Sequence, residues 1–145
     1  MDHVAIMNPK YGLIEMILNG EKKVESRWYL SRKAPWDRIK KGDTVFLKYS
    51  GKPVEAKAEV RKVLQFEYLK PKNVREILRD YGDKGKIFIQ NKKYAYEHYK
   101  YKKFCILVFL ANPKKVRRFN IDKTGFGIGS AWIITSRIAK IKRGL

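Results

Sequence analysis

The sequence predicts an α+β fold: a small mixed, mainly antiparallel β-barrel with two to three short helices. Residues 54–61 alternate between apolar and charged side chains with a strict period of two, which is typical of a half-buried antiparallel strand. Strand-like segments dominate both ends of the chain, and helical segments are inserted at two places between them. The chain has 145 residues, the size of one domain, so we expect a single domain over residues 1–145.

The N-terminal segment predicts a strand, a helix and a second strand in succession. Residues 3–7 form the first strand. The Asn-Pro pair at positions 8–9 then supplies a helix N-cap and a first helical residue, and the apolar side chains within residues 13–18 share one helical face. Gly20 provides the left-handed C-cap of this helix, and residues 23–29 form the second strand.

The middle of the chain continues this pattern. Residues 35–42 predict a loop or short turn, and residues 44–49 predict the third strand. A turn over residues 50–53 leads into the alternating strand at 54–61.

Two more helices are expected before the C-terminal strands. Apolar residues within positions 74–81 recur at i, i+3, i+4 and i+7, and Gly82 follows as a stop signal. Residues 91–99 predict a second, short helix.

The C-terminal half predicts three strand segments. Residues 104–110 are the most apolar run and should form a central strand, with the single cysteine, Cys105, as an inert core residue. Pro113 is expected to break this strand, which residues 116–121 can resume. Residues 131–135 predict the last clear strand.

The charge balance indicates a polyanionic partner. Lys and Arg total 34 against 14 acidic residues, which gives a net charge of +20 and a sequence pI near 10.1. Such an excess on one face attracts nucleic acid and releases its counterions on binding. A lysine-coated surface without a specific ligand is the alternative. The basic clusters at residues 114–118 and 137–143 fit either a cationic strand face that follows a phosphate backbone or a solvated face.

Several other classes of protein receive no support from the sequence. The single cysteine cannot form an internal disulfide, and the two histidines lack partners at metal-ligand spacing, so we expect neither a metal nor a cofactor. No basic amphipathic helix, export signal or apolar stretch of 18 residues is visible, which predicts a cytoplasmic protein that does not bind membranes. Abundant Lys and Glu with little Cys and Gln resemble the composition of thermophilic proteins.

A compact motif follows the first predicted helix. Residues 20–27, Gly-Glu-Lys-Lys-Val-Glu-Ser-Arg, fit the pattern G-x-K-x-x-E-x-R. This segment resembles the signature of the ASCH family, a branch of the PUA-like superfamily, and the order of strand, helix, glycine cap and second strand is also similar. The resemblance implies a PUA-like barrel with a cleft, between the barrel and the first helix, that receives a nucleotide or a similar ligand. Lys22, Glu25 and Arg27 would line this cleft.

The residue types of the motif suit recognition of an anion or of a base edge. In an extended strand, Glu25 and Arg27 share one face, and a carboxylate beside a guanidinium can orient it toward a phosphate or a base. The alternative is an ordinary ion pair on a sheet.

Further candidates surround the motif. Trp28 and Trp36 lie among cations and could stack bases, although an aromatic residue near a strand is more often part of the core. The remaining candidates are cations near the motif, the end of the third strand, and a loop with alternating glycines that could bring backbone amides close to an anion. They are Arg32, Lys33, Lys48 and Tyr49, and, in the loop, Gly127, Gly129, Ser130 and Trp132.

The sequence favours a binding module over an enzyme, and RNA over DNA as its partner. Resemblance to the ASCH family also implies an alternative, because some relatives hydrolyse acetylcytidine and others cut RNA. Where the amidohydrolases carry a threonine nucleophile, this chain has Glu25, which argues against the same mechanism. Glu25 could still act as a general base, with Lys22 beside it, in a hydrolase that acts on RNA or on a modified nucleoside.

Overall fold

The computed structural model describes residues 1–85, 87, 91–127 and 129–145. The strands are β1 (Asp2–Met7), β2 (Val24–Tyr29), β3 (Thr44–Tyr49), β4 (Val54–Phe66), β5 (Phe104–Ile121), β6 (Trp132–Thr135) and β7 (Lys142–Arg143). The helices are α1 (Leu13–Leu18), α2 (Pro71–Gly85) and α3 (Lys92–Tyr99), with 3₁₀ turns η1 (Pro9–Tyr11) and η2 (Ile138–Lys140).

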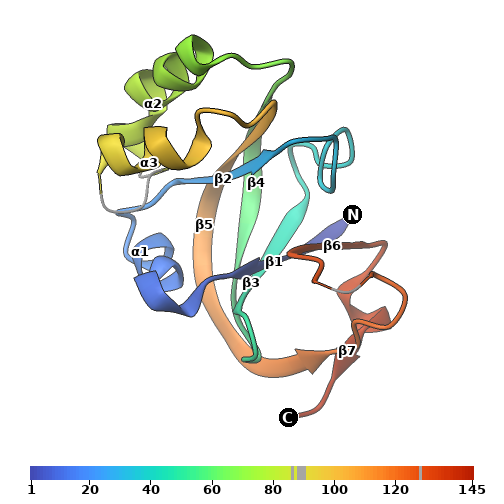
Figure 1. The fold of residues 1–145 in the computed structure, drawn as a ribbon. Coiled ribbons are helices and arrows are strands. Elements are labelled where there is room, and N and C mark those ends of the chain that lie inside the picture. The colour runs from blue at the N-terminus through green and yellow to red at the C-terminus, as the bar shows by residue number, and fades with distance from the viewer. Residues whose placement is uncertain (86, 88–90, 128) are drawn as a thin grey trace.

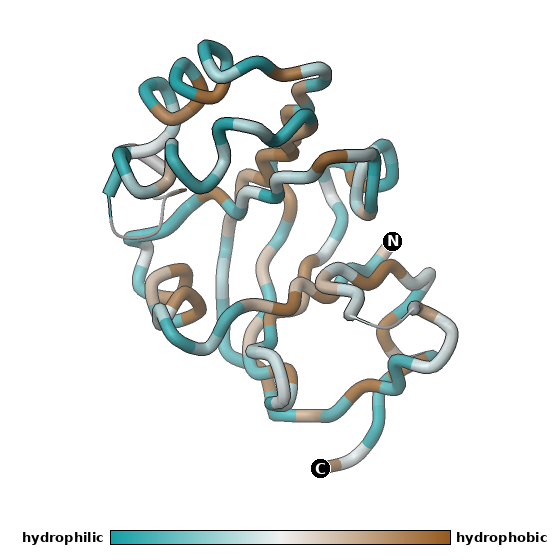
Figure 2. The backbone as a smooth tube through the Cα atoms, in the orientation of Figure 1, coloured by the Kyte–Doolittle hydropathy of each residue, from teal (hydrophilic) through white to brown (hydrophobic). Residues whose placement is uncertain are grey.

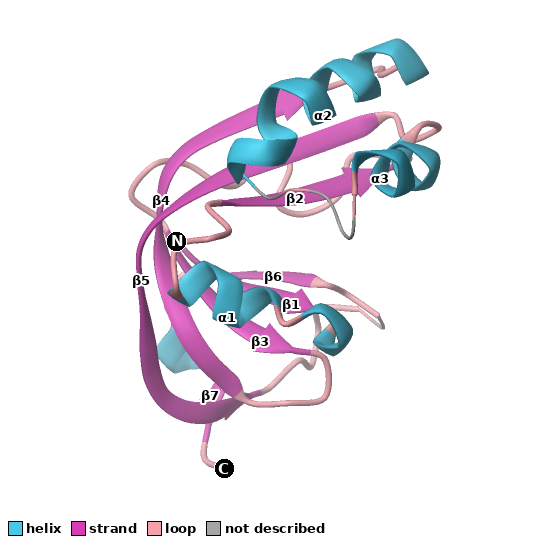
Figure 3. Cartoon of the chain, turned by 90° about the vertical axis from the view of Figure 1, so that its left-hand side faces the viewer, coloured by secondary structure: helices cyan, strands magenta, loops and turns pink. Residues whose placement is uncertain are grey.

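The strands form one strongly curled sheet, as Figures 1 and 3 show. Its order is β2-β5-β4-β3-β1-β6, and β7 pairs with the far end of β5. The β1–β3 pair is parallel and the other pairs are antiparallel. The predicted mixed, mainly antiparallel α+β fold is therefore confirmed, and the sheet curls into a half-barrel.

Apolar side chains from both faces of this sheet build the core. In Figure 2, where the backbone is coloured by hydropathy, hydrophobic stretches alternate with hydrophilic ones along the strands and helices. On the concave face, Ile14 and Ile17 of α1 pack against strand residues such as Leu47 and Val108. Helices α2 and α3 cover the convex face of β2 and β5, where Cys105 is buried as predicted. A third cluster joins the C-terminal segment to β1 and β3. The sheet is thus covered on both sides, which holds β2 and its motif in place.

The first predicted helix is divided in two. Asn8 caps a 3₁₀ turn instead of the α-helix, and its side chain accepts a hydrogen bond from the Lys10 backbone N–H at 2.9 Å. Gly12 then adopts a left-handed conformation, with φ of 61°, which ends that turn before α1 begins at Leu13. Gly20 has φ of 85° just after α1, in agreement with its predicted capping role.

Two stop signals were read wrongly from the sequence. Helix α2 continues through Gly82 to Gly85, because packing of its apolar face outweighs the helix cost of one glycine, about 1 kcal/mol. Strand β5 continues through Pro113, because a register shift between β4 and β5 places an unpaired, bulged segment at Asn112 and Pro113. Proline is tolerated at such a bulge, where no ladder hydrogen bond is lost.

Candidate functional site

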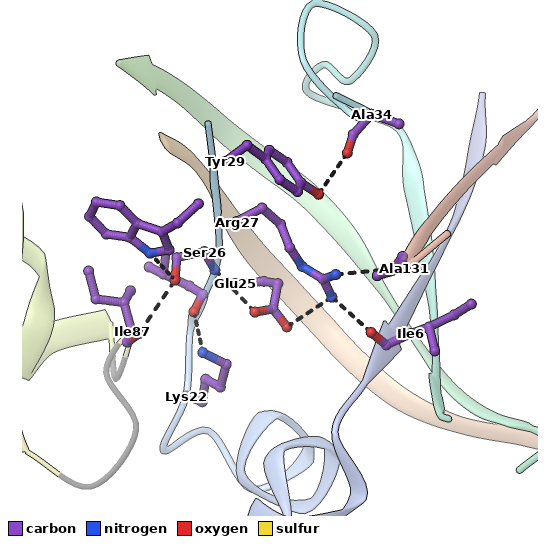
Figure 4. A network of polar contacts seen from close by, with 11 residues as sticks. Ile6, Lys22, Glu25, Ser26, Arg27, Tyr29, Ala34, Ile87 and Ala131 are labelled. Carbon is purple, nitrogen blue, oxygen red and sulfur yellow. Dashed lines mark hydrogen bonds and ion pairs between the residues drawn. The ribbon is translucent and has the colours of Figure 1, made fainter. Parts of the chain in front are cut away.

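Strand β2 carries the motif on an edge of the sheet and divides its side chains between two environments. Val24 and Trp28 point to the convex face and join the cluster under α2 and α3. Glu25 and Arg27 point to the other face, toward β1 and the segment before β6 (Figure 4). The strand therefore anchors itself with one set of side chains and presents charges with the other.

Arg27 forms hydrogen bonds from one edge of the curled sheet to the region of the other edge. Its Nη1 donates a hydrogen bond to the Ala131 carbonyl at 3.1 Å, and its Nη2 donates to the Ile6 carbonyl at 3.3 Å. The guanidinium also lies over the Trp132 ring, 5.0 Å from the centroid. Because β2 and β6 are the first and last strands in the sheet order, this side chain bridges the seam between them.

Glu25 lies beside Arg27, and its carboxylate is buried. Its residue is 6% exposed, Oε1 accepts a hydrogen bond from the Ser26 backbone N–H, and Oε2 lies 4.0 Å from Nη2 of Arg27. Among the residues that the structure describes, Oε2 has no hydrogen-bond partner. A buried carboxylate oxygen without a donor is costly, and such an atom calls for a functional explanation.

Lys22 completes the charged cluster from the turn before β2. It is 4% exposed, and its Nζ donates a hydrogen bond to the Val24 carbonyl at 2.7 Å. Burial lowers the pKa of Lys22, the Glu25 carboxylate opposes this shift and the Arg27 guanidinium adds to it. The same residue lines a small cavity of about 300 Å³ between the end of α1 and β5, with Gly20 and Arg61 among its walls.

Two tyrosines border this cluster, Tyr29 just after the motif and Tyr99 from α3, and only the second was not visible from the sequence. Tyr29 donates a hydrogen bond to the Ala34 carbonyl at 2.9 Å, and burial raises its pKa. Burial raises the pKa of Tyr99 to about 12, and the nearby Glu25 carboxylate adds to the shift. Tyr29 follows Arg27 with the period of a strand and could have been found in the sequence, whereas Tyr99 comes from α3 and carries no such signal.

The end of β3 holds α1 in position. The Tyr49 hydroxyl donates a hydrogen bond to the Glu15 carboxylate and accepts one from the Ile14 backbone N–H at 3.0 Å. Burial raises the pKa of Tyr49 to about 12, so this hydroxyl stays protonated. Lys48, the residue before Tyr49, is also buried. Burial lowers the pKa of Lys48, and the nearby positive charge of Lys123 lowers it further.

The aromatic and cationic candidates that follow the motif occupy different surroundings. Trp28 is 7% exposed, and its ring stacks on Tyr99 with centroids 4.6 Å apart. Trp28 therefore belongs to the core, the alternative to base stacking that the sequence left open. Trp36 packs edge-on against Phe104. Arg32 and Lys33 are exposed: Arg32 pairs with Glu67 at 2.7 Å, and the ammonium of Lys33 lies 5.9 Å from the centroid of the Tyr29 ring.

The glycine loop reaches the motif through Ala131. Gly127 and Gly129 have φ values of 88° and 74°, which glycine adopts without strain. The Ser130 hydroxyl donates a hydrogen bond to the Trp132 carbonyl at 3.1 Å, and Trp132 in turn contacts Arg27. The structure therefore brings the loop to Arg27 but places Arg32 and Lys33 elsewhere, on the segment after β2.

Buried hydrogen bonds connect Asp43 through His3 to Trp132. Its indole N–H donates to Nδ1 of His3 at 3.0 Å, and Nε2 of His3 lies 2.9 Å from the Asp43 carboxylate. His3 is therefore the Nε2–H tautomer, with a lone pair on Nδ1. In the described ranges, no three acidic, histidine or cysteine side chains converge as metal ligands, and no helix is long and apolar enough to cross a membrane.

Comparisons with known proteins give a likeness of structure alone. The sequence matches no protein-family model and no curated protein. The crystal structure of ASCH from Zymomonas mobilis superposes with a TM-score of 0.65 at 15% identity, covering 99% of this chain and 96% of that one. A tyrosine-to-phenylalanine mutant of the same protein gives a TM-score of 0.66 at 16% identity, covering 96% and 93%. A serine-to-alanine mutant gives 0.65 at 17% identity, covering 96% and 91%.

Proposed function

From the premise that this chain has the ASCH-domain fold, we propose that it is a nucleic-acid-binding module whose ligand contacts Lys22, Glu25 and Arg27. RNA is the favoured partner, on the resemblance of residues 20–27 to the ASCH signature. The observation that carries the proposal is Oε2 of Glu25, a buried carboxylate oxygen without a donor among the described residues. A nucleobase amino or imino group is the kind of donor that would satisfy it.

Arg27 can serve the ligand and the fold at the same time. A guanidinium has five N–H donors, and the hydrogen bonds to the Ile6 and Ala131 carbonyls use only two of them. Because those two bonds and the Trp132 ring fix its plane, little side-chain entropy would be lost on binding. The net charge of +20 supplies the long-range attraction for the polyanion.

A titration with isosteric variants tests this proposal. Labelled single-stranded RNA, duplex RNA and DNA of one sequence are titrated into wild type, Glu25→Gln and the control Glu21→Gln at several salt concentrations. Glu21 is an exposed glutamate of the same motif segment, so both variants remove one negative charge. If charge alone drove binding, both variants would bind slightly more tightly than wild type.

The proposal predicts the opposite sign for one variant. Glu25→Gln should weaken single-stranded RNA binding at least about tenfold, because an acceptor buried with the base is lost, with an unchanged salt slope. Glu21→Gln should bind as well as wild type or better. Equal behaviour of the two variants would refute a role of Glu25, and tighter binding of DNA would refute the preference for RNA.

A hydrolase that acts on RNA or on a modified nucleoside is the second candidate. It is favoured by Lys22, whose pKa is lowered by burial beside the Glu25 carboxylate, since such a pair suits general acid–base chemistry. Incubation of the same RNA and of acylated nucleosides with protein should then give product that disappears in Glu25→Gln but not in Glu21→Gln. Intact substrate with wild type would leave binding as the function of the site.

A further inference from the structure

A second basic surface lies away from the motif, between α2 and α3. The two helices enclose a groove of about 660 Å³. Among its lining residues, five are basic and one is acidic: Lys72, Arg75, Arg79, Lys92, Lys93 and Glu76.

The positions of these cations lower the stability of helices α2 and α3. Lys72 lies in the first turn of α2, and Lys92 and Lys93 lie in the first turn of α3, while neither first turn has an acidic residue. The N-terminus of a helix carries partial positive charge and normally favours Asp or Glu. The spacing of Lys72, Arg75 and Arg79 adds like charges three and four residues apart, which costs a few tenths of a kcal/mol per pair. An anion in the groove would offset both costs.

Part of this charge is not neutralised by the protein. Arg79 pairs with Asp80 at 2.9 Å, and Lys92 pairs with Asp83 at 3.0 Å. In contrast, Lys72, Arg75 and Lys93 form no ion pair with any residue in the described part of the chain.

The Arg75 guanidinium is held over the other wall of the groove. It lies 4.7 Å from the centroid of the Tyr96 ring of α3, so its position is restrained without a carboxylate partner. A guanidinium that is held in position without a carboxylate partner can donate hydrogen bonds to a phosphate.

Two of the three acidic residues of α2 also border a second cavity, whereas the third, Asp83, pairs with Lys92 of α3. Glu76 and Asp80 line a separate cavity of about 480 Å³ with Glu67, beside the end of β4. Helix α2 therefore presents Lys72, Arg75 and Arg79 to the groove with one carboxylate, Glu76, and the groove lining carries a net positive charge.

We propose that the α2–α3 groove binds the phosphate backbone of a single-stranded nucleic acid, as a second contact surface for the ligand of the motif. This inference rests on the proposed function for the identity of the polyanion. The two surfaces are joined through β2: Trp28 of β2 stacks on Tyr99 at the end of α3, and the Ser26 hydroxyl donates a hydrogen bond to the Ile87 carbonyl between the two helices. The structure therefore places the helices that line the groove next to the strand that carries the motif (Figure 1).

Matched neutralisations test the groove. Lys72→Gln with Lys93→Gln removes one unpaired lysine from each wall. The control, Lys52→Gln with Lys140→Gln, removes two exposed lysines from the opposite end of the molecule, in the β3–β4 turn and in η2. Fluorescence anisotropy with oligouridylate of 5 and 20 nucleotides is measured over a range of salt, and thermal melting confirms that each variant is folded.

The inference predicts an effect that depends on site and on strand length. For the 20-mer, the groove variant should lower the slope of log K against log salt by about 1.4, since each single-strand phosphate contact contributes ~0.7. The groove variant should bind the 20-mer at least about fivefold more weakly than the control variant does. It should bind the 5-mer nearly as tightly as the control variant does. Equal loss in both lysine variants, or the same loss with polyglutamate in place of the 20-mer, would overturn it.

The Glu25→Gln variant separates the two proposals. If Glu25→Gln weakens binding while the groove and control variants are alike, the motif site stands and the groove inference fails. If only the groove variant weakens binding, the groove binds the strand and the proposed role of the motif fails. If wild type binds neither oligonucleotide at any salt concentration, both are refuted.

Discussion

Replacement of Tyr49 by phenylalanine removes one oxygen atom and should loosen α1. The Tyr49 hydroxyl accepts the Ile14 backbone N–H at 3.0 Å and donates to the Glu15 carboxylate, so a single atom of β3 serves two groups of α1. The phenyl ring of the variant fills the same volume in the core cluster. The change in stability should therefore report the lost hydrogen bonds and not a cavity.

The expected loss of stability depends on the two groups that lose a hydrogen-bond partner, the Ile14 N–H and the Glu15 carboxylate. A buried N–H without an acceptor costs about 1–3 kcal/mol, and Ile14 is fully buried. Glu15 is exposed and regains water, so its bond contributes about 0.5–1 kcal/mol. The free energy of unfolding should fall by about 1.5–4 kcal/mol, which lowers Tm by about 5–12 °C for a domain of this size.

Urea and thermal denaturation measure this change, with Tyr101→Phe as the matched control. Tyr101 is 69% exposed, and its hydroxyl has no hydrogen bond with any described residue, so its loss should change Tm by less than about 1 °C. A Tm decrease below about 2 °C for Tyr49→Phe would refute the conclusion that this hydroxyl fixes α1.

Three further predictions concern Arg27, His3 and Cys105. Arg27→Ala should lower the free energy of unfolding by about 3 kcal/mol in urea, because it cuts two hydrogen bonds across the seam and removes the guanidinium beside the Glu25 carboxylate, and Arg27→Lys should recover part of this loss. Burial lowers the pKa of His3 below 6.5, so the unfolded chain binds more protons just below that pH. Stability should fall as pH decreases from about 7 toward the folded-state pKa, and His3→Gln should lack this slope. Burial raises the pKa of the Cys105 thiol well above its usual value, so iodoacetamide should label it only under unfolding conditions.

Local sequence patterns predicted much of the fold because each depends on residues close together in the chain. The third strand was placed at residues 44–49 by its β-branched and aromatic residues, and β3 has those bounds. The alternation at 54–61 marked a strand with one buried face, and β4 buries the alternate positions Val54, Ala56, Ala58 and Val60.

The errors arose where tertiary packing outweighed a local signal. Gly82 costs helix stability by itself, but the apolar face of α2 within residues 74–81 packs in one cluster with β2 and β5, and Ile87 beyond the helix belongs to the same cluster. Pro113 lacks a backbone donor, but the bulge at Asn112 removes the need for one. Neither compensation can be read from neighbouring residues.

The candidate site was predicted in its residue types and not in its partners. The spacing of Glu25 and Arg27 placed them on one strand face, and the structure brings them within 4.0 Å. The carbonyls that hold Arg27 belong to Ile6 and Ala131, which are 21 and 104 residues away in the chain, and no local pattern signals such contacts. The cationic lining of the α2–α3 groove also becomes visible only once α3 is placed beside α2.

The central claim is that the buried Glu25 carboxylate contacts the nucleic acid, and the ¹³C chemical shift of its side-chain carboxyl carbon tests it most directly. Single-stranded RNA is titrated at a salt concentration that suppresses phosphate contacts, and the Glu21 carboxyl carbon serves as the internal reference. We predict a saturable shift at Glu25, with the same midpoint as the binding curve, and no shift at Glu21. If RNA binds while the Glu25 signal stays unchanged, the ligand does not contact this carboxylate and the proposed site is wrong.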